Sequence, residues 1–289
     1  GIVTSVEAKI FKDAFYADDF LRSFRTIDEA ISVAEKATQL LDKRGFKLTK
    51  FVSTSKEFLN AMPKDRLHPN VAEADVRGKT SSALGIRWHL DSDELSIGAI
   101  FDISPDEQLT KRRLLSVLMT TFDPIGAIGF ALVPGKIILQ SAFRFDIRWD
   151  ERLPDTMQRD VRKWIKELQR MHEAKFPRLI QPIDSDQVIR RELHVFADSS
   201  TLCFAAICFL RSASADGSIL VRHVASRNRL APLKGQMVPR LELNSALLAA
   251  RLHHNVKREL DLEIHASFFW SDSMSTLGMI RNKTTRFQI

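Results

Sequence analysis

The sequence predicts a chain of more than one domain that combines α+β and α/β organisation. Two short apolar runs and a helix pattern come first, the middle is predicted as helices, and the last third alternates strands with helices. With 289 residues, the chain is long enough for two or three domains with buried cores.

The composition favours a folded protein with a polyanionic partner. The net charge is +7 and 27% of the residues are charged, which mildly favours nucleic acid as that partner. No apolar run reaches the roughly 18 residues of a membrane span, and no secretory signal is present, so we expect no membrane association. Cys203 and Cys208 lie five positions apart in one predicted strand and face opposite sides, which predicts free thiols in a reducing compartment.

Two adjacent acids stand between apolar residues near the start of the chain. Residues 8–24, "AKIFKDAFYADDFLRSF", predict two short strands with Asp18 and Asp19 at the turn between them. Two neighbouring carboxylates repel each other and lower the strand propensity of their flanks. A metal ion at the turn would remove that penalty.

The next segments predict a helix, a strand and a hairpin. The helix begins after Thr26, which with Glu29 forms a capping box, and it ends near Gly45. Residues 46–54 are predicted to be a strand. The stretch "ALGIRWHLDSDELSIGAIF" predicts a β-hairpin with Asp91–Glu94 at its turn.

Residues 107–178 predict three helices with an excess of cations, 14 Lys and Arg against 9 Asp and Glu. The cluster of Lys111, Arg112 and Arg113 is the candidate nucleic-acid contact here, and a solvated helix face is the alternative. The four tryptophans are interpreted as core anchors rather than base-stacking platforms. They are Trp88, Trp149, Trp164 and Trp270.

Three acids in the last third occupy places that packing alone does not explain. Asp198 ends the apolar strand "LHVFAD", Asp272 ends "SFFWSD", and Glu242 shares a helix face with Ala246 and Ala249. If the two strands are neighbours and the helix packs on them, the three carboxylates converge. Clustered carboxylates repel unless a cation neutralises them, and such oxygen ligands suit Mg²⁺ in phosphodiester cleavage.

Each acid also has a simpler explanation. A strand-end Asp is commonly a turn or helix cap, and a Glu in a first helical turn commonly interacts with the helix dipole. The order strand-Asp, two strands, helix-Glu, strand-Asp favours a site, because a set of caps has no reason to produce it. His253 and His254 are interpreted as packed or solvent-facing, since neither has the partner spacing of a metal site.

Several motifs resemble one family. "FYADDFL" resembles the Tyr-x-Asp-Asp motif of reverse transcriptases, and longer segments resemble polyproteins of BEL/Pao-type LTR retrotransposons. These segments are "TIDEAISVAEKATQLLDKRGFKLTKFVSTS", "LGIRWHLDSDEL", "LLSVLMTTFDPIGAIGFALVPGKIILQ" and "VASRNRLAPLKGQMVPRLELNSALLAARL".

The resemblance implies a partial reverse transcriptase palm, a helical thumb or connection, and a partial ribonuclease H-like mixed sheet with helices. It implies Mg²⁺, or alternatively Mn²⁺, at Asp18 and Asp19 and at the three later acids, with Tyr16 under the primer end or the incoming nucleotide. The expected partners are template–primer nucleic acid, RNA–DNA hybrid and deoxynucleotides. The expected location is intracellular, in cytoplasmic particles or the nucleus.

The resemblance also implies domain boundaries. These are 1–60 for the palm part, 61–105 for a hairpin region, 106–178 for the thumb or connection, 179–191 for a linker and 192–289 for the ribonuclease H-like domain. A third polymerase aspartate is expected upstream of residue 1 and a fourth ribonuclease H acid beyond residue 289, so we expect a fragment of a longer polymerase with incomplete sites.

Two other functions stay open at this point. One is a domesticated or decayed retroelement remnant that only binds nucleic acid or a protein. The other is an aspartic peptidase, a class to which this region of such polyproteins is also assigned. We discount the peptidase, because Asp198 is followed by Ser199 and Ser200 rather than by the Thr/Ser-Gly that presents a peptidase aspartate.

Overall fold

A computed structural model of the protein describes residues 11–16, 18–71, 80–83, 85–98, 101–181 and 185–282. The chain divides into two compact units. Unit 1 comprises Gly1–Ala83 and Arg87–Leu95, and unit 2 comprises Leu84–Ile86 and Ser96–Ile289. Within the described residues, no helix is both long enough and apolar enough to cross a membrane.

The part of the chain up to residue 97 consists of short elements. In chain order they are β1 (Phe15–Tyr16), β2 (Asp19–Phe20), α2 (Ile27–Asp42), α3 (Lys56–Ala61), the 3-10 turns Lys64–Arg66 and Pro69–Val71, β3 (Thr80–Ala83), β4 (Ile86–His89) and β5 (Glu94–Ile97). The capping box forms as predicted, because the Thr26 hydroxyl accepts from the Glu29 backbone N–H at 3.2 Å. The predicted hairpin is β4–β5, with residues 90–93 at its turn.

One predicted strand of this part is shorter than expected, and another is absent. Residues 11–14, expected to be extended, are helical, and β1 begins only at Phe15. The spacing of Phe11, Ala14 and Phe15 also fits one face of a helix. In so short a run, the helix period and the strand period cannot be told apart. Ile10 lies outside the described residues.

Residues 46–54 form only an isolated parallel bridge between Phe51 and Leu67 instead of a strand. Lys50, with φ of 61°, breaks the extended conformation one residue before that bridge.

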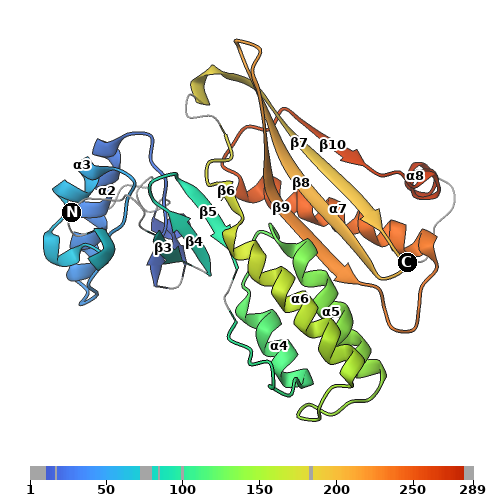
Figure 1. Ribbon diagram of the computed structural model, residues 1–289. Coiled ribbons are helices and arrows are strands. Elements are labelled where there is room, and N and C mark those ends of the chain that lie inside the picture. The colour runs from blue at the N-terminus through green and yellow to red at the C-terminus, as the bar shows by residue number, and fades with distance from the viewer. Residues whose placement is uncertain are drawn as a thin grey trace. The chain divides into compact units, whose positions relative to one another are not determined.

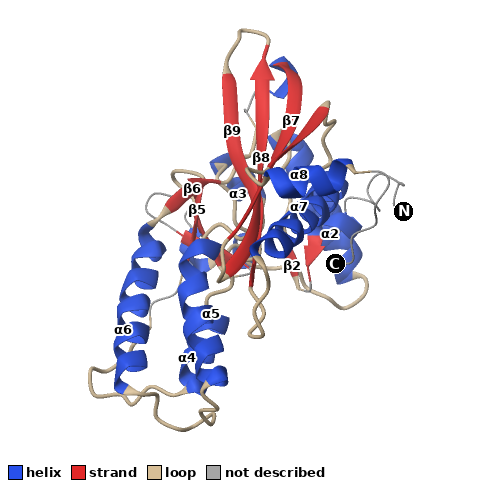
Figure 2. Ribbon diagram, turned by 90° about the vertical axis from the view of Figure 1, so that its right-hand side faces the viewer, coloured by secondary structure: helices blue, strands red, loops and turns tan. Residues whose placement is uncertain are grey.

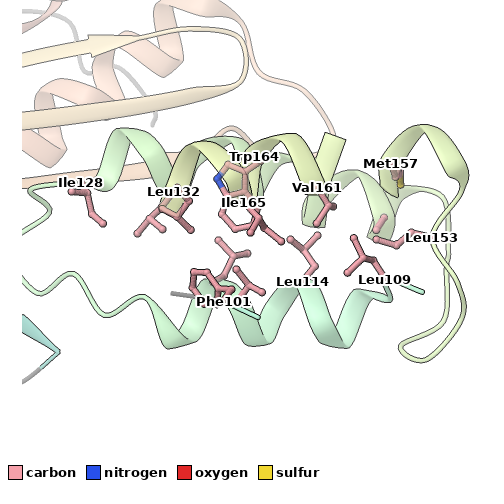
Figure 3. Close-up of a cluster of buried hydrophobic side chains, with 14 of the residues drawn as sticks. Phe101, Leu109, Leu114, Ile128, Leu132, Leu153, Met157, Val161, Trp164 and Ile165 are labelled. Carbon is pink, nitrogen blue, oxygen red and sulfur yellow. The ribbon is translucent and has the colours of Figure 1, made fainter. Parts of the chain in front are cut away.

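Unit 2 begins with three helices that share one core. They are α4 (Lys111–Thr120), α5 (Gly129–Arg144) and α6 (Asp155–Arg170), and they lie side by side (Figure 2). Their buried side chains, among them Leu114, Val161 and Trp164, face one another between the helices (Figure 3). The three predicted helices and the turn at Asp123 are therefore confirmed.

The rest of unit 2 is a mixed sheet with a long helix. After β6 (Lys175–Pro177) and short 3-10 turns at Met171–Glu173 and Ser185–Gln187, the elements are β7 (Val188–Ser199), β8 (Cys203–Ser214), β9 (Ile219–Leu230), α7 (Val238–Glu259), β10 (Ala266–Trp270) and α8 (Met274–Arg281). The strand order is β10-β7-β8-β9, with β10 parallel to β7 and the other pairs antiparallel. A second four-stranded sheet has the order β3-β4-β5-β6.

Helix α7 covers one face of the β7–β10 sheet (Figure 1). Leu193, Val195, Cys208 and Leu210 of the sheet pack with α7 residues in a single buried cluster. Both cysteines are free, as predicted, and burial raises the pKa of the Cys208 thiol to about 11. The strands, α7 and α8 all fall where the sequence predicted them, although β7 begins at Val188, inside the predicted linker.

Candidate metal centre

The ends of two parallel strands bring Asp198 and Asp272 together. Asp198 is the second-last residue of β7, and Asp272 follows β10, whose Trp270 pairs with Phe196 of β7. Because parallel neighbours have their carboxyl ends at the same edge of the sheet, the two acids share that edge. Glu242 reaches the same place from α7, which packs on these strands.

The three carboxylates converge. One oxygen atom of each lies within 4.8 Å of the other two, and within the described residues no other set of three His, Cys, Asp or Glu side chains is arranged this closely. Asp198 and Asp272 are exposed, whereas Glu242 is only 8% exposed. Convergence of the acids at one end of the sheet is what the sequence predicted.

The surroundings of Glu242 disfavour the charged form of its carboxylate. Its Oε2 atom is buried and has no hydrogen-bond partner among the described residues. Burial raises the pKa of Glu242, the nearby Ser199 hydroxyl partly opposes this shift, and the Asp198 and Asp272 carboxylates raise the pKa further. A cation at this point would supply the missing partner and neutralise the repulsion.

Short polar contacts hold the acids in place. The Ser199 backbone N–H donates to Asp198 Oδ1 at 2.7 Å, and the Ser245 hydroxyl donates to the Glu242 carbonyl at 2.7 Å. The loop that carries Asp272 is fixed by Ser273, whose hydroxyl accepts from the Thr276 N–H at 3.2 Å and caps α8. Sequence reasoning did not assign these serines, since a Ser beside an Asp is an ordinary turn composition.

The predicted hairpin near the N-terminus forms, although Asp19 belongs to its second strand rather than to the turn. Tyr16 of β1 pairs with Asp19 of β2, and Asp18 lies in the turn between them. Tyr16 is 58% exposed. Within the described residues, no third His, Cys, Asp or Glu joins Asp18 and Asp19 in a cluster suited to a metal ion.

The cluster at the start of α4 has other partners. Lys111 is buried, with its ammonium 3.9 Å from the centre of the Phe143 ring. Arg112 forms two hydrogen bonds with Asp150, at 2.7 and 2.9 Å. Arg113 pairs with Glu107 at 2.8 Å. All three cations thus have partners within the protein, and their contact with nucleic acid stays a prediction.

Two of the four tryptophans are not core anchors, contrary to the prediction. Trp164 is buried and Trp88 packs partly against a core cluster, but Trp149 is 40% and Trp270 is 48% exposed. Trp270 instead stacks on the His194 and Phe196 rings, at interplanar angles of 12° and 14°. Alternation along β10 places it on the sheet face away from α7, which a count of tryptophans does not show.

The histidines behave as predicted. His253 lies 2.8 Å from the Ser267 hydroxyl and packs edge-on against the Phe269 ring, while His254 is exposed.

This fold and this site define a class of protein. Three antiparallel strands, a helix, a parallel strand and an acid from each of β7, α7 and the end of β10 are the arrangement of a ribonuclease H-like domain. A model of the family described as Pao retrotransposon-like RNaseH-like domain matches residues 110–273, more than half of the chain. The chain belongs to this family, which confirms the resemblance and the fold class predicted from the sequence.

Two further comparisons complete these findings. A search of curated proteins finds no match. Among solved structures, the chain is similar to the foamy viral protease-reverse transcriptase dRH in complex with double-stranded DNA, at 16% identity and a TM-score of 0.44, covering 95% of this chain and 42% of that one. It is also similar to the foamy viral protease-reverse transcriptase in complex with double-stranded DNA, at 14% identity and a TM-score of 0.45, covering 96% of this chain and 51% of that one.

Proposed function

We propose that Asp198, Glu242 and Asp272 bind Mg²⁺ and cleave the RNA strand of RNA–DNA hybrids. The observation that carries this proposal is the buried Glu242 Oε2 atom, which lacks a partner and lies beside two further carboxylates. Three carboxylates are a donor set that suits Mg²⁺ or Mn²⁺. The family supports nuclease chemistry, since its members are ribonuclease H-like.

Each residue has a distinct part in this proposal. Bound metal would activate water and stabilise the charge that develops on the scissile phosphate. Asp198 and Asp272 are exposed, so they would meet both the ion and the substrate. Glu242 would hold the ion from the protein side, and Ser199 would orient the Asp198 carboxylate through its backbone N–H.

A cleavage assay tests the proposal. A longer protein that contains this chain is incubated with a hybrid labelled on its RNA strand, with Mg²⁺ or with EDTA. We expect cleavage only with Mg²⁺, and a rate in Asp198→Asn lower by roughly 100-fold or more, the scale for removing one group that stabilises transition-state charge. Asp106→Asn is the matched control, because Asp106 is exposed and outside the cluster.

The outcomes separate the alternatives. Retained cleavage in Asp198→Asn would overturn the site assignment. Binding of the hybrid without any cleavage would favour a remnant that only binds nucleic acid. Proteolysis inhibited by pepstatin at acidic pH would favour the aspartic peptidase.

We also propose a role for the N-terminal hairpin in a longer polymerase. Asp18 and Asp19 adjoin at the turn, and Tyr16 is exposed beside them, as RNA-templated nucleotide addition would require. In the longer protein, Asp18→Asn should abolish Mg²⁺-dependent primer extension while ribonuclease H cleavage continues. Primer extension that survives this change would refute the role.

A further inference from the structure

Helix α6 carries a row of four cations that has no assigned role. Arg159, Lys163, Lys166 and Arg170 follow one another at intervals of four, three and four residues and are all exposed. These intervals place them on a single stripe of the helix. We refer to these four residues as the α6 cationic row.

The row lies opposite the buried face of α6. Val161, Trp164 and Leu168 fill the core on the other side of the helix. The acids Asp160 and Glu167 flank the row, since Asp160 lies three residues before Lys163 and Glu167 four residues after it. Asp155, four residues before Arg159, begins the same stripe and pairs with Arg152 at 2.6 Å. From Arg159 to Arg170, the centre of the stripe carries only cations.

The row has no internal counter-ions. None of its four side chains makes an ion pair or hydrogen bond within the described part of the chain. The neighbouring Arg162 behaves differently, since its guanidinium donates to the Ser104 and Glu107 carbonyls. Arg162 is thus bonded within the protein, whereas the cations of the row are exposed on α6 and can contact a partner.

We propose that the α6 cationic row binds the phosphate backbone of a nucleic-acid strand. From its first to its last member the row rises roughly 16 Å, at about 1.5 Å per residue. Measured along the axis of a duplex, this length corresponds to about five phosphates of one strand, at 3.4 Å of axis for each. Phosphate contacts of this kind position a nucleic acid without reading its sequence.

This inference deepens the proposed function, because it names where the hybrid is held, but it needs no metal at the acid cluster. It also differs from the prediction for Lys111, Arg112 and Arg113, which have partners within the protein. The alternative is that the row is only a solvated face, which would bind polyanions no better than any other exposed cations do.

The experiment measures how hybrid binding depends on salt. A labelled RNA–DNA hybrid is titrated with the full chain in EDTA at several KCl concentrations, and anisotropy gives the association constant. Each neutralised phosphate contact makes the slope of log K against log salt more negative by about 0.9. We expect Lys163→Gln with Lys166→Gln to make the slope less negative by about 1.8 and to weaken binding.

The matched control is Arg251→Gln with Lys257→Gln on α7. These residues are also exposed, and their replacement removes the same net charge from the same unit. We expect the control to keep the wild-type slope. Equal changes of slope in both double variants would show a general charge effect and overturn the proposal. An unchanged slope in the row variant would overturn it as well.

Two further arms complete the design. Heparin replaces the hybrid in one arm. If the row variant lost affinity for heparin but not for the hybrid, the proposal for nucleic acid would be overturned. In the other, the titrations are repeated with Mg²⁺ in place of EDTA, and the slope of the row variant should differ from that of the wild type by the same amount in both. Failure of the nuclease assignment therefore leaves this result intact, and failure of the row leaves the cleavage result intact.

Discussion

Glu242 is buried on α7 with an unpartnered Oε2 atom and two carboxylates nearby. A buried polar atom without a partner costs on the order of 1–3 kcal/mol, and more when the group is charged. Nothing in the packing of α7 requires this, since a neutral side chain of the same size would fill the same space. The cost is thus concentrated at the point where the acids converge.

The charge of Glu242 should make the metal-free protein less stable. Its pKa is raised from the ordinary value of 4.5, first by burial, so the destabilisation that Glu242 causes is absent below pH 4.5 and is fully present once pH has risen through the folded pKa. We expect Glu242→Gln to melt at a higher temperature than the wild type at neutral pH in EDTA. Below pH 4.5 the difference should vanish.

Magnesium should reverse this order. Ligand binding at 100 times its Kd stabilises the folded state by about 2.7 kcal/mol, so Mg²⁺ should raise the Tm of the wild type and leave that of Glu242→Gln nearly unchanged. Glu263→Gln, an exposed acid outside the cluster, is the control and should follow the wild type. An equal Mg²⁺ response in both variants would contradict a metal site at Glu242.

At the residue scale, the sequence predicted acids better than cations. Asp198, Glu242 and Asp272 stood out because each interrupts an apolar pattern, and the structure brings them together. Arg112 is different: its partner Asp150 lies 38 residues away, and a run of cations does not show where its counter-ions are. The spacing of the α6 cationic row can be read from the sequence, but acids stand between its members along the chain.

At the scale of elements, helices were predicted more accurately than short strands. A helix such as α2 is defined by its own cap and apolar stripe, which are local. A strand also needs a neighbour, and residues 46–54 find only one bridging residue, Leu67. Long strands such as β7 and β8 were found because their apolar alternation continues beyond what any local helix period allows.

The packing of α5 on α6 depends on a glycine. A Cβ atom on Gly135 would overlap the indole ring of Trp164, whose Nε1 donates to the Ala131 carbonyl at 2.7 Å. We expect Gly135→Ala to destabilise the protein by about 1–3 kcal/mol through overpacking. Urea unfolding followed by tryptophan fluorescence measures this change.

Gly278→Ala is the control for that prediction. Gly278 lies in α8, and no heavy atom comes within 4 Å of a Cβ placed there. The same substitution should therefore stabilise, by up to about 1 kcal/mol, through helix propensity alone. Equal effects at both positions would show that helix propensity, and not contact with Trp164, controls the stability of α5.

At the scale of the molecule, the helices α4–α6 and the β7–β10 sheet belong to one unit. The family match continues from residue 110 to 273 across the predicted linker, and the contacts group both parts in unit 2. The resemblance implies a linker at residues 179–191 between a thumb or connection region and a ribonuclease H-like domain. The sequence could not show that β9 would return to the helices, because those contacts join residues about a hundred positions apart.

Specific hydrogen bonds join β9 to α5 and to the turn before it. The Ser226 N–H donates to the Ile125 carbonyl at 2.7 Å, and its hydroxyl donates to the Gly126 carbonyl. Further along, Lys136 Nζ donates to Asn228 Oδ1 at 3.0 Å. The turn before α5 approaches β9 so closely that a Cβ atom on Gly126 would overlap the Ser226 carbonyl.

Gly126→Ala should therefore weaken the whole of unit 2. Gly126 has φ of 76°, which costs a residue with a Cβ atom about 1–2 kcal/mol, and the overlap adds about 1–3 kcal/mol. Gly217→Ala is the control, because Gly217 has φ of 83° but open space around it, so only the first cost applies. Hydrogen exchange read by mass spectrometry should show faster exchange in both α5 and β9 of Gly126→Ala. Loss of protection in α5 alone would mean that the helices and the sheet fold independently, as the predicted boundaries had it.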